Sequence, residues 1–372
     1  MMSPGEEIAV NLMWLRPGEV GGSESYIRRV LRSVAAARPD LDLCLIGGVE
    51  ALESVAPQNA KLVTPPVSNR ARAARVAAER MWLSRVMDRR ASVLHHPGGT
   101  VPFTSETPTV VTIHDLQPLT NPQHFSRSKR AYLDRAIPAA VAHADIITTP
   151  SDWVRADVIE RLRVGEERVV TVSAYAEIVD TSLATSPSPQ LKTILGRGPV
   201  VFYPAMTLGH KNHKFLFDAF EIARGIDPTL QLVCTGVMGK DHKEIEEYAA
   251  SVSPAIHMLG RVSGNDLEAL FAGSEMLVFP SLYEGFGLTI LEAQQAGLPV
   301  VSSSATSLPE VAGQGAILLD PTDLDGWATA MANRIGGSER AEMVSLGRAN
   351  AARYSAEVTG AAQLGAYDLA CS

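Results

Sequence analysis

The chain has few cysteines and no long apolar run. Cys44, Cys234 and Cys371 are the only cysteines among 372 residues, and they lie far apart. This odd, scattered set without Cys-x-x-Cys spacing indicates neither a disulfide framework nor a zinc site. No apolar stretch reaches the roughly 18 residues that a membrane-spanning helix needs. The N-terminal "EEIAVNLMWL" has acidic flanks, unlike a signal peptide. We therefore expect a cytoplasmic protein with reduced thiols.

An excess of positive charge is also missing. Lys and Arg number 33 against 41 Asp and Glu, which gives a net charge of −8, whereas nucleic-acid-binding domains are broadly basic. No nucleic-acid partner is expected. One local exception is the basic segment from Arg70 to Arg90, "RARAARVAAERMWLSRVMDRR". It could dock on anionic lipid at the inner face of a membrane or receive a phosphorylated acceptor, but ordinary surface helices carry similar charge, so membrane contact is not favoured.

Several nucleotide and metal motifs are absent. No Gly-x-Gly-x-x-Gly follows a strand pattern, so a dinucleotide-dependent dehydrogenase lacks its fingerprint. "TGVMGKD" is too short for a P-loop, and no Ser or Thr follows its Lys. No Asp-x-Asp stands at a strand end, where it could hold a metal. We expect neither a metal nor a cofactor, so a lysine and helix N-termini would have to bind any phosphate group.

Short apolar runs alternate with helical patterns through both halves of the chain. Such runs, hydrophobic on both faces, indicate parallel sheets covered by helices on both sides. The first half contains "IAVNLMWL", "LDLCLIGG", "SVLHHPG", "PTVVTIHD", "ADIITTPS" and "RVVTVSAY". The second half contains "PVVFYPA", "LQLVCTGV", "AIHMLG", "MLVFPS", "PVVSSS" and "AILLDP". The pattern predicts two Rossmann-like, doubly wound α/β domains with an interdomain cleft.

The expected domain boundaries follow from composition. The first domain is predicted at residues 1–181 and the second at residues 198–354, joined by a linker at residues 182–197 that includes the Ser-, Thr- and Pro-rich "TSLATSPSPQ". Residues 355–372 are expected to form a helix that returns to the first domain. Neither half contains an internal repeat.

The stretch "SLYEGFGLTILEAQQAGLP" places two carboxylates around a glycine-rich turn that opens into a helix. The helix should run roughly from Leu288 to Ala296, with Gly297 as its stop. Its free N–H groups attract anions, while Glu284 and Glu292 are acceptors suited to pairs of hydroxyls. A phosphate between hydroxyls describes a sugar nucleotide. The alternative is that Glu284 is a solvated loop residue and Glu292 faces water.

Other polar residues follow strand patterns, at the edge where open α/β sheets bind ligands. Position alone assigns them no role, and His95 and His96 could simply cap their loop. Arg261 could likewise be a solvated loop charge. The residues that stand at these ends include the "GGSES" loop with Gly22, the pair His95 and His96, His114, and the "HKNHK" loop with His210 and Lys211.

In these motifs the chain resembles a known family, the retaining glycosyltransferases of the GT-B fold, which is typified by sucrose synthase and bacterial α-mannosyltransferases. The most specific match is "FPSLYEGFGLTILEAQQAGLPVVSSSATSLPEV", which resembles the Glu-x7-Glu donor signature of this group, glycosyltransferase family 4. The resemblance covers nearly the whole chain. It also includes "GGSES", "VVTIHDL", "TPSDWVRADV", "HKNH" and "LGRVSGNDLEALFAGSEMLVFPS".

The resemblance implies a role for each matching residue. Lys211 would neutralise the diphosphate leaving group, and Glu284 would sit at the donor sugar. His114 would face the reacting sugar from the other domain, and Glu292 would bind the ribose hydroxyls. The implied catalytic residues are His114, Lys211 and Glu284. The implied donor-binding residues are Gly22, His210, Arg261, Phe286, Gly287, Leu288, Thr289 and Glu292.

The chain departs from the family in two places. Members usually carry an Arg about six residues before the lysine, where this chain has Ala205, and His210 or His213 would have to compensate. The loop that often reads Asn-Gly-Val-Asp is replaced by "SAYAEIVD". The contacts implied for these two positions therefore do not carry over.

The resemblance implies metal-independent transfer of a sugar, with retention, to an acceptor hydroxyl of a glycan, glycolipid or natural product. GDP-mannose and UDP-sugars both remain open as donors. The alternatives are a sugar-nucleotide epimerase, which needs no acceptor, and an inactive sugar-nucleotide-binding protein. A phosphorylase would need a much longer chain and a lysine for pyridoxal phosphate. The sequence indicates neither the acceptor nor the oligomeric state.

Overall fold

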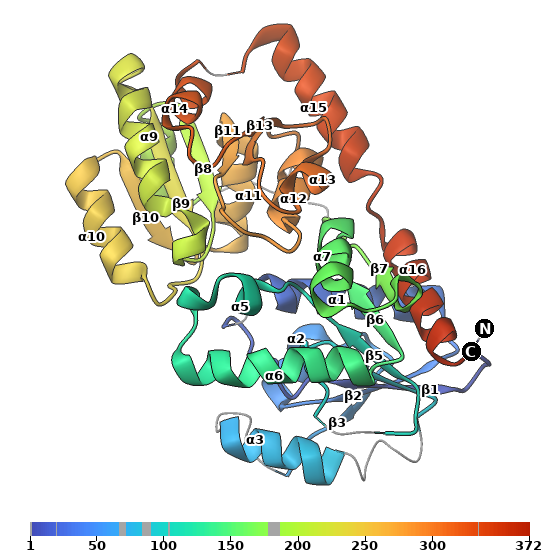
Figure 1. The fold of residues 1–372 in the computed structure, drawn as a ribbon. Coiled ribbons are helices and arrows are strands. Elements are labelled where there is room, and N and C mark those ends of the chain that lie inside the picture. The colour runs from blue at the N-terminus through green and yellow to red at the C-terminus, as the bar shows by residue number, and fades with distance from the viewer. Residues whose placement is uncertain are drawn as a thin grey trace. The chain divides into compact units, whose positions relative to one another are not determined.

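The computed structural model describes residues 2–19, 21–66, 72–83, 91–102, 105–177, 187–333 and 335–372. The chain divides into two compact units (Figure 1). Unit 1 comprises Met1–Ala174 together with Ser355–Ser372, and unit 2 comprises Tyr175–Tyr354. Each unit is an α/β domain built on one parallel sheet.

The sheet of unit 1 has the strand order β3-β2-β1-β4-β5-β6-β7. Every neighbouring pair in it is parallel. Six of these strands agree with the six apolar runs of the first half, whereas β3 was not predicted, because it is a three-residue strand whose side chains are mostly exposed and lack the apolar signal. The strands are β1 (Glu7–Asn11), β2 (Asp42–Ile46), β3 (Lys61–Val63), β4 (Val93–His96), β5 (Thr109–Thr112), β6 (Ile146–Thr149) and β7 (Val169–Thr171).

Helices flank this sheet, and the last helix of the chain is one of them. Gly360 of that helix, α16, packs so closely on the α1 backbone that an added Cβ would lie 2.8 Å from the Ser33 carbonyl oxygen. The Thr359 hydroxyl also donates to the Ser173 carbonyl at 2.7 Å. The helices are α1 (Gly22–Ala37), α2 (Val49–Val55), α3 (Arg72–Ala78), a π-helical turn (Glu79–Leu83), α5 (Gln117–Thr120), α6 (Arg127–His143), α7 (Asp152–Leu162), α16 (Ala356–Ala370) and the 3-10 turns Pro122–His124 and Glu166–Arg168.

The sheet of unit 2 has the order β10-β9-β8-β11-β12-β13, again parallel throughout. All six strands expected in this half are confirmed, because each is a short apolar run bounded by polar or turn residues. They are β8 (Val200–Pro204), β9 (Gln231–Thr235), β10 (Ile256–Gly260), β11 (Met276–Phe279), β12 (Val300–Ser303) and β13 (Ile317–Leu319).

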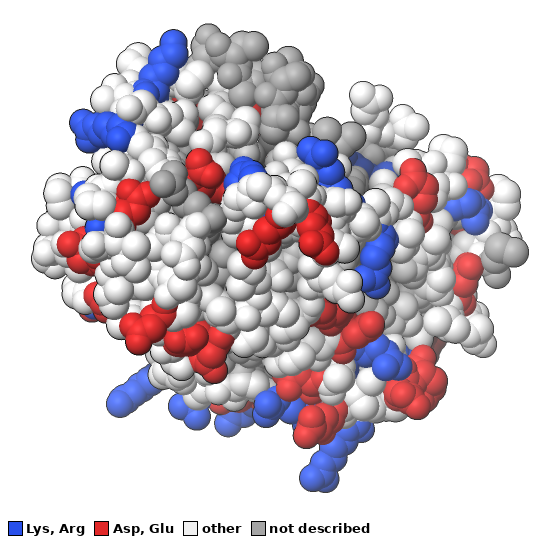
Figure 2. Space-filling model, turned by 90° about the horizontal axis from the view of Figure 1, so that it is seen from above, with Lys and Arg blue, Asp and Glu red and all other residues white. Residues whose placement is uncertain are grey.

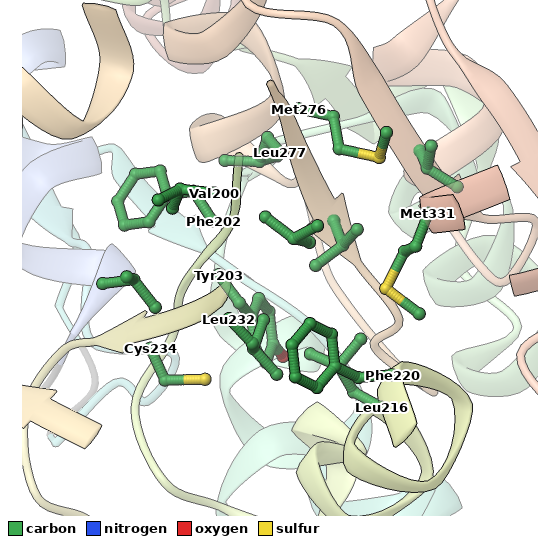
Figure 3. Packing of buried hydrophobic residues seen from close by; sticks show 14 of the residues in the cluster. Val200, Phe202, Tyr203, Leu216, Phe220, Leu232, Cys234, Met276, Leu277 and Met331 are labelled. Carbon is green, nitrogen blue, oxygen red and sulfur yellow. The ribbon is translucent and has the colours of Figure 1, made fainter. Parts of the chain in front are cut away.

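The helices of unit 2 bury one extensive apolar core against the sheet. Figure 3 shows part of it, with Tyr203 of β8 beside Leu216 and Phe220 of α9. Trp327 is fully buried in the same cluster. The helices are α8 (Pro189–Leu195), the 3-10 turn η5 (Gly209–Lys211), α9 (His213–Ile226), α10 (His242–Val252), α11 (Gly264–Gly273), α12 (Leu288–Ala296), α13 (Leu308–Ala312), α14 (Leu324–Ala332) and α15 (Gly337–Ala351).

Part of the segment expected to be a linker forms a helix. Residues 178–186 lie outside the described residues, but α8 occupies the second part of the segment. Ser188 caps this helix, and Leu191 and Ile194 are buried in the core of unit 2. The Ser and Pro that suggested a linker therefore act at the start of a helix, where both residue types are favoured.

The surface carries side chains of both charge signs, which are interspersed on the face seen in Figure 2. Among the described residues, no helix is long and apolar enough to cross a membrane.

Candidate functional site

Two of the expected site residues follow neighbouring strands at the switch point of unit 2. The strands β8 and β11 are adjacent in the sheet, although β9 and β10 lie between them in the chain. Ligands of open α/β sheets bind beyond the carboxyl ends of such strands. The loop after β8 carries Lys211, and the turn after β11 carries Glu284. The topology therefore places both residues at the preferred ligand edge of this sheet.

The Lys211 side chain is held at this edge by charge and by an aromatic ring. Its ammonium forms an ion pair with Glu284, and the two side chains are only 16% and 14% exposed. The same ammonium lies 5.6 Å from the centroid of the Phe279 ring. The buried Tyr203 hydroxyl donates to the Lys211 carbonyl at 2.6 Å. The lysine is thus fixed at its backbone and at its charged end.

The next residue, Asn212, binds the loop to two other segments at this edge of the sheet. It adopts the left-handed conformation, with φ of 61°, which asparagine tolerates better than most residues. Its side-chain amide donates to the carbonyl oxygens of Pro280 at 3.2 Å and Pro321 at 3.1 Å. Asn212 therefore connects the lysine loop to the segments after β11 and β13. This role of Asn212 was not predicted from the sequence.

A second scaffold fixes the backbone of the Glu284 turn. The Glu284 N–H donates to the Thr306 hydroxyl oxygen at 3.0 Å. The Ser307 hydroxyl lies 3.0 Å from both the Glu284 and the Phe286 carbonyl oxygens, to which it donates. Both supporting residues come from the loop after β12, "SSSATS". Their position after a strand was a visible signal, but their contacts depend on tertiary structure.

The turn leads into α12, whose bounds and glycine stop agree with the sequence prediction. Gly287 at the N-cap has φ of 110°, and a Cβ there would lie 2.8 Å from Leu308 Cδ2, so a side chain at this position would be strained and crowded. No described residue accepts a hydrogen bond from the N–H groups of Phe286, Gly287 or Leu288. These donors and the helix dipole make the end of α12 attractive to an anion. Thr289 and the half-buried Glu292 lie on the same helix.

Lys211 supplies a positive charge at this edge, whereas His213, two residues further along the chain, does not. His213 is buried against the Tyr203 ring, with centroids 4.9 Å apart. Burial, with a smaller effect from Lys211, lowers the pKa of His213 to about 3, so its imidazole is neutral near neutral pH. His210 is half-buried, and its carbonyl accepts a hydrogen bond from the Leu282 N–H at 2.8 Å. His213 therefore offers no charge in place of the Arg that Ala205 replaces.

Unit 1 places His114 beyond β5, between two aromatic rings. Its ring centroid lies 5.1 Å from that of Tyr26 on α1 and 6.1 Å from that of Trp14. Its Nε2 donates to the Pro97 carbonyl at 2.9 Å, and burial lowers the pKa of His114 to about 4. The neutral ring therefore carries its proton on Nε2 and presents Nδ1 as an acceptor. Gly22, one turn before Tyr26, is exposed with open space around it.

The other histidines and basic residues differ in their surroundings. His95 is fully buried and bonds to Thr112 at 2.8 Å and Tyr367 at 2.9 Å, which ties the sheet of unit 1 to α16. His96 is buried with its Nδ1 3.3 Å from the Asn11 amide. Neither is a loop cap. Arg261 is exposed after β10 and forms no ion pair with a described residue.

The basic segment is described only in part. Residues 67–71 and 84–90 lie outside the described residues, while α3 and the π-helical turn occupy Arg72–Leu83. Arg75 lies 3.8 Å from Glu79, and their side chains are only 16% and 8% exposed. This arginine is therefore engaged inside unit 1. Membrane contact through the segment stays a prediction.

Among the described residues, no group of three or more His, Cys, Asp or Glu side chains is arranged to hold a metal ion. The expectation of metal independence therefore rests on the chemistry of Lys211 and α12 and stays a prediction.

Both halves of the chain match models of known protein families. A family model described as Glycosyl transferases group 1 matches residues 198–335, and one described as Glycosyltransferase Family 4 matches residues 20–174. O-antigen chain mannosyltransferase B of Escherichia coli is 26% identical over 369 residues, covering 94% of this chain and 96% of the relative. Serotype-specific mannosyltransferase WbdA of Escherichia coli is 29% identical over 241 residues, covering 61% of this chain and 29% of the relative.

A solved structure also matches across both units. Anabaena HepE in complex with UDP and glucose superimposes with a TM-score of 0.73 at 18% identity, covering 97% of this chain and 98% of that one. The chain belongs to the glycosyltransferases of the GT-B fold, group 1 and family 4, and resembles bacterial mannosyltransferases.

Proposed function

We propose that the protein transfers a sugar from a nucleoside diphosphate sugar to an acceptor hydroxyl, with retention of anomeric configuration and without a metal. The observation that carries this proposal is the placement of Lys211 and Glu284 beside the unpartnered N–H groups of α12 at one switch point. A diphosphate needs cationic and N–H partners, and a sugar needs acceptors for its hydroxyls. This sheet edge offers both.

The proposed chemistry assigns one task to each group. Lys211 and the N–H groups of Phe286 to Leu288 stabilise the departing diphosphate as the bond from the sugar C1 to its oxygen breaks. The acceptor oxygen forms the new bond to C1 and gives its proton to the departing phosphate oxygen, so no protein base is needed. Glu284 accepts hydrogen bonds from the sugar, and Glu292 accepts them from the ribose. His114 offers Nδ1 to a sugar hydroxyl.

For the donor we propose GDP-mannose or a UDP-sugar. Two relatives carry the name mannosyltransferase, which favours a mannose donor, while the HepE structure holds UDP and glucose. The relative named for O-antigen chains supports a glycan or glycolipid acceptor. Such an acceptor would bring the protein near a membrane surface, but contact through the basic segment is not favoured, because Arg75 of that segment is paired with Glu79 inside unit 1.

We expect transfer to survive chelation. The purified protein should move labelled sugar from GDP-mannose or UDP-glucose into a glycolipid fraction at an unchanged rate with excess EDTA, because Lys211 and α12 supply the charge that a metal would otherwise provide. Loss of transfer on chelation, with recovery on adding Mg²⁺ or Mn²⁺, would refute metal independence. Release of nucleotide and an altered sugar without any acceptor would instead indicate an epimerase.

Asn212→Gly should lower turnover about tenfold, since a small misplacement of a catalytic group is costly. Glycine keeps the left-handed backbone, so the change removes mainly the two side-chain hydrogen bonds to Pro280 and Pro321. These bonds are together worth about 2 kcal/mol of folding stability. Steady-state kinetics should show a lower kcat with a smaller change in the KM for the donor.

The matched control is Arg163→Gly, which places glycine at another left-handed position, the end of α7 in unit 1. It should leave kcat unchanged. A lower melting temperature in Asn212→Gly with an unchanged kcat would show that Asn212 supports the fold alone and does not position Lys211.

A further inference from the structure

The lysine proposed to hold the diphosphate already has a carboxylate partner within the protein. Lys211 and Glu284 form an ion pair in which both side chains are largely enclosed. A charge pair in such surroundings interacts more strongly than one in open water. A diphosphate that binds Lys211 therefore meets a fixed negative charge beside the same ammonium.

Glu284 has little freedom to leave this position. The Glu284 N–H and carbonyl are both bonded to the loop after β12, through Thr306 and Ser307. On the other side, Asn212 and Tyr203 hold the lysine loop. Because both backbones are fixed, the carboxylate stays within reach of the ammonium, and competition between Glu284 and a diphosphate is built into the site.

The competition has opposite consequences for an intact donor and for the product. Hydroxyls of the donor sugar can donate hydrogen bonds to Glu284, which offset the repulsion between the carboxylate and the diphosphate. A nucleoside diphosphate that has lost its sugar offers no such donors. Only the repulsion and the competition for Lys211 then remain.

We propose that Glu284 discriminates against the nucleoside diphosphate product and promotes its release by pairing again with Lys211. This inference rests on the proposed function. It adds a second role for Glu284, which lowers the affinity for the product relative to the affinity for the donor. It predicts that removing the negative charge of Glu284 makes the product bind more tightly while turnover falls. If Glu284 only bound the ligand, its removal would lower both the product affinity and the turnover.

The test compares wild type with Glu284→Gln, which keeps the shape and removes the charge. Isothermal titration with GDP and with UDP should show a dissociation constant for the preferred nucleotide about fivefold or more below that of wild type. The intact GDP-mannose or UDP-glucose should gain less or bind more weakly. Product inhibition of transfer should strengthen by the same factor as the nucleotide affinity.

The control is Glu244→Gln, which removes the carboxylate of another lysine pair, that of Lys214. This pair is exposed, at 45% for the lysine and 72% for the glutamate, and its loss should not change nucleotide affinity. Glu284→Ala provides a second variant and should also bind the nucleotide more tightly than wild type.

Two failures are distinguishable. If wild type binds a nucleoside diphosphate but both Glu284 variants bind it equally or more weakly, the discrimination role is wrong and the donor site stands. If neither wild type nor the variants bind GDP or UDP, the proposed function fails, and this inference fails with it.

Discussion

Lys211→Ala should lower turnover by about two orders of magnitude, because one preorganised charge on a leaving group contributes about 3 kcal/mol to the transition state. The diphosphate gains charge as it departs, so the ammonium matters more in the transition state than in the bound donor. Single-turnover kinetics with saturating donor would measure this effect on the chemical step.

The chain offers a matched control for this variant. Lys214 lies three residues further on, is 45% exposed and pairs with Glu244 on the surface. Lys214→Ala should keep wild-type turnover. Because Lys211→Ala leaves Glu284 without its partner, the double variant with Glu284→Gln should be compared for thermal stability. Near-normal turnover in a folded Lys211→Ala protein would overturn the assignment of the diphosphate to this residue.

Glu292→Ala should remove most of the stabilisation that a bound nucleotide gives. A ligand at 100 times its dissociation constant stabilises the fold by about 2.7 kcal/mol, and charge-assisted hydrogen bonds of the kind proposed for the ribose are each worth about 1.5–3 kcal/mol. Losing them should cancel much of the nucleotide-induced rise in melting temperature.

The control for Glu292 is Glu247→Ala on α10, a 69% exposed carboxylate that pairs with Lys243. It should respond to nucleotide like wild type. A thermal shift in Glu292→Ala as large as that of wild type would contradict the ribose assignment. A smaller shift with each nucleotide, together with an unchanged shift with inorganic phosphate, which has no ribose, would support it.

Much of the fold could be predicted because its signals are local. Strands β8 to β13 are short apolar runs, and α12 ends at Gly297 with φ of 78°, a left-handed stop typical of glycine. Strand β3 and helix α8 were missed for the opposite reason. The first is short and exposed, and the second begins with Ser and Pro, which also mark irregular segments.

The candidate site likewise has some features that the sequence predicted and others that it could not predict. The glycine turn and its two glutamates were visible as a motif, and the free N–H groups follow from helix geometry alone. The hydrogen bonds that hold the two loops in place could not be predicted. Asn212 reaches Pro321, 109 residues further along the chain, and Ser307 reaches back to Glu284. Such contacts are made only in the folded chain, and no local pattern encodes them.

The ion pair between Lys211 and Glu284 could not be predicted either. The resemblance gave each residue its own ligand, one the diphosphate and the other the sugar, but nothing in the spacing of the two motifs indicated that they meet. The pairing changes the interpretation of Glu284, from a residue that only recognises the donor to one that also competes with the product.

Binding of a nucleoside diphosphate sugar by unit 2 can be measured in a thermal-shift screen of the unmodified protein with UDP, GDP, ADP and dTDP. Ligands that bind only the folded state raise the melting temperature, by more when the ligand concentration exceeds the dissociation constant by a larger factor. We expect a clear rise in melting temperature with GDP or UDP for the unmodified protein, and a smaller rise for Lys211→Ala and Glu292→Ala. The absence of a shift with all four nucleotides would contradict this expectation.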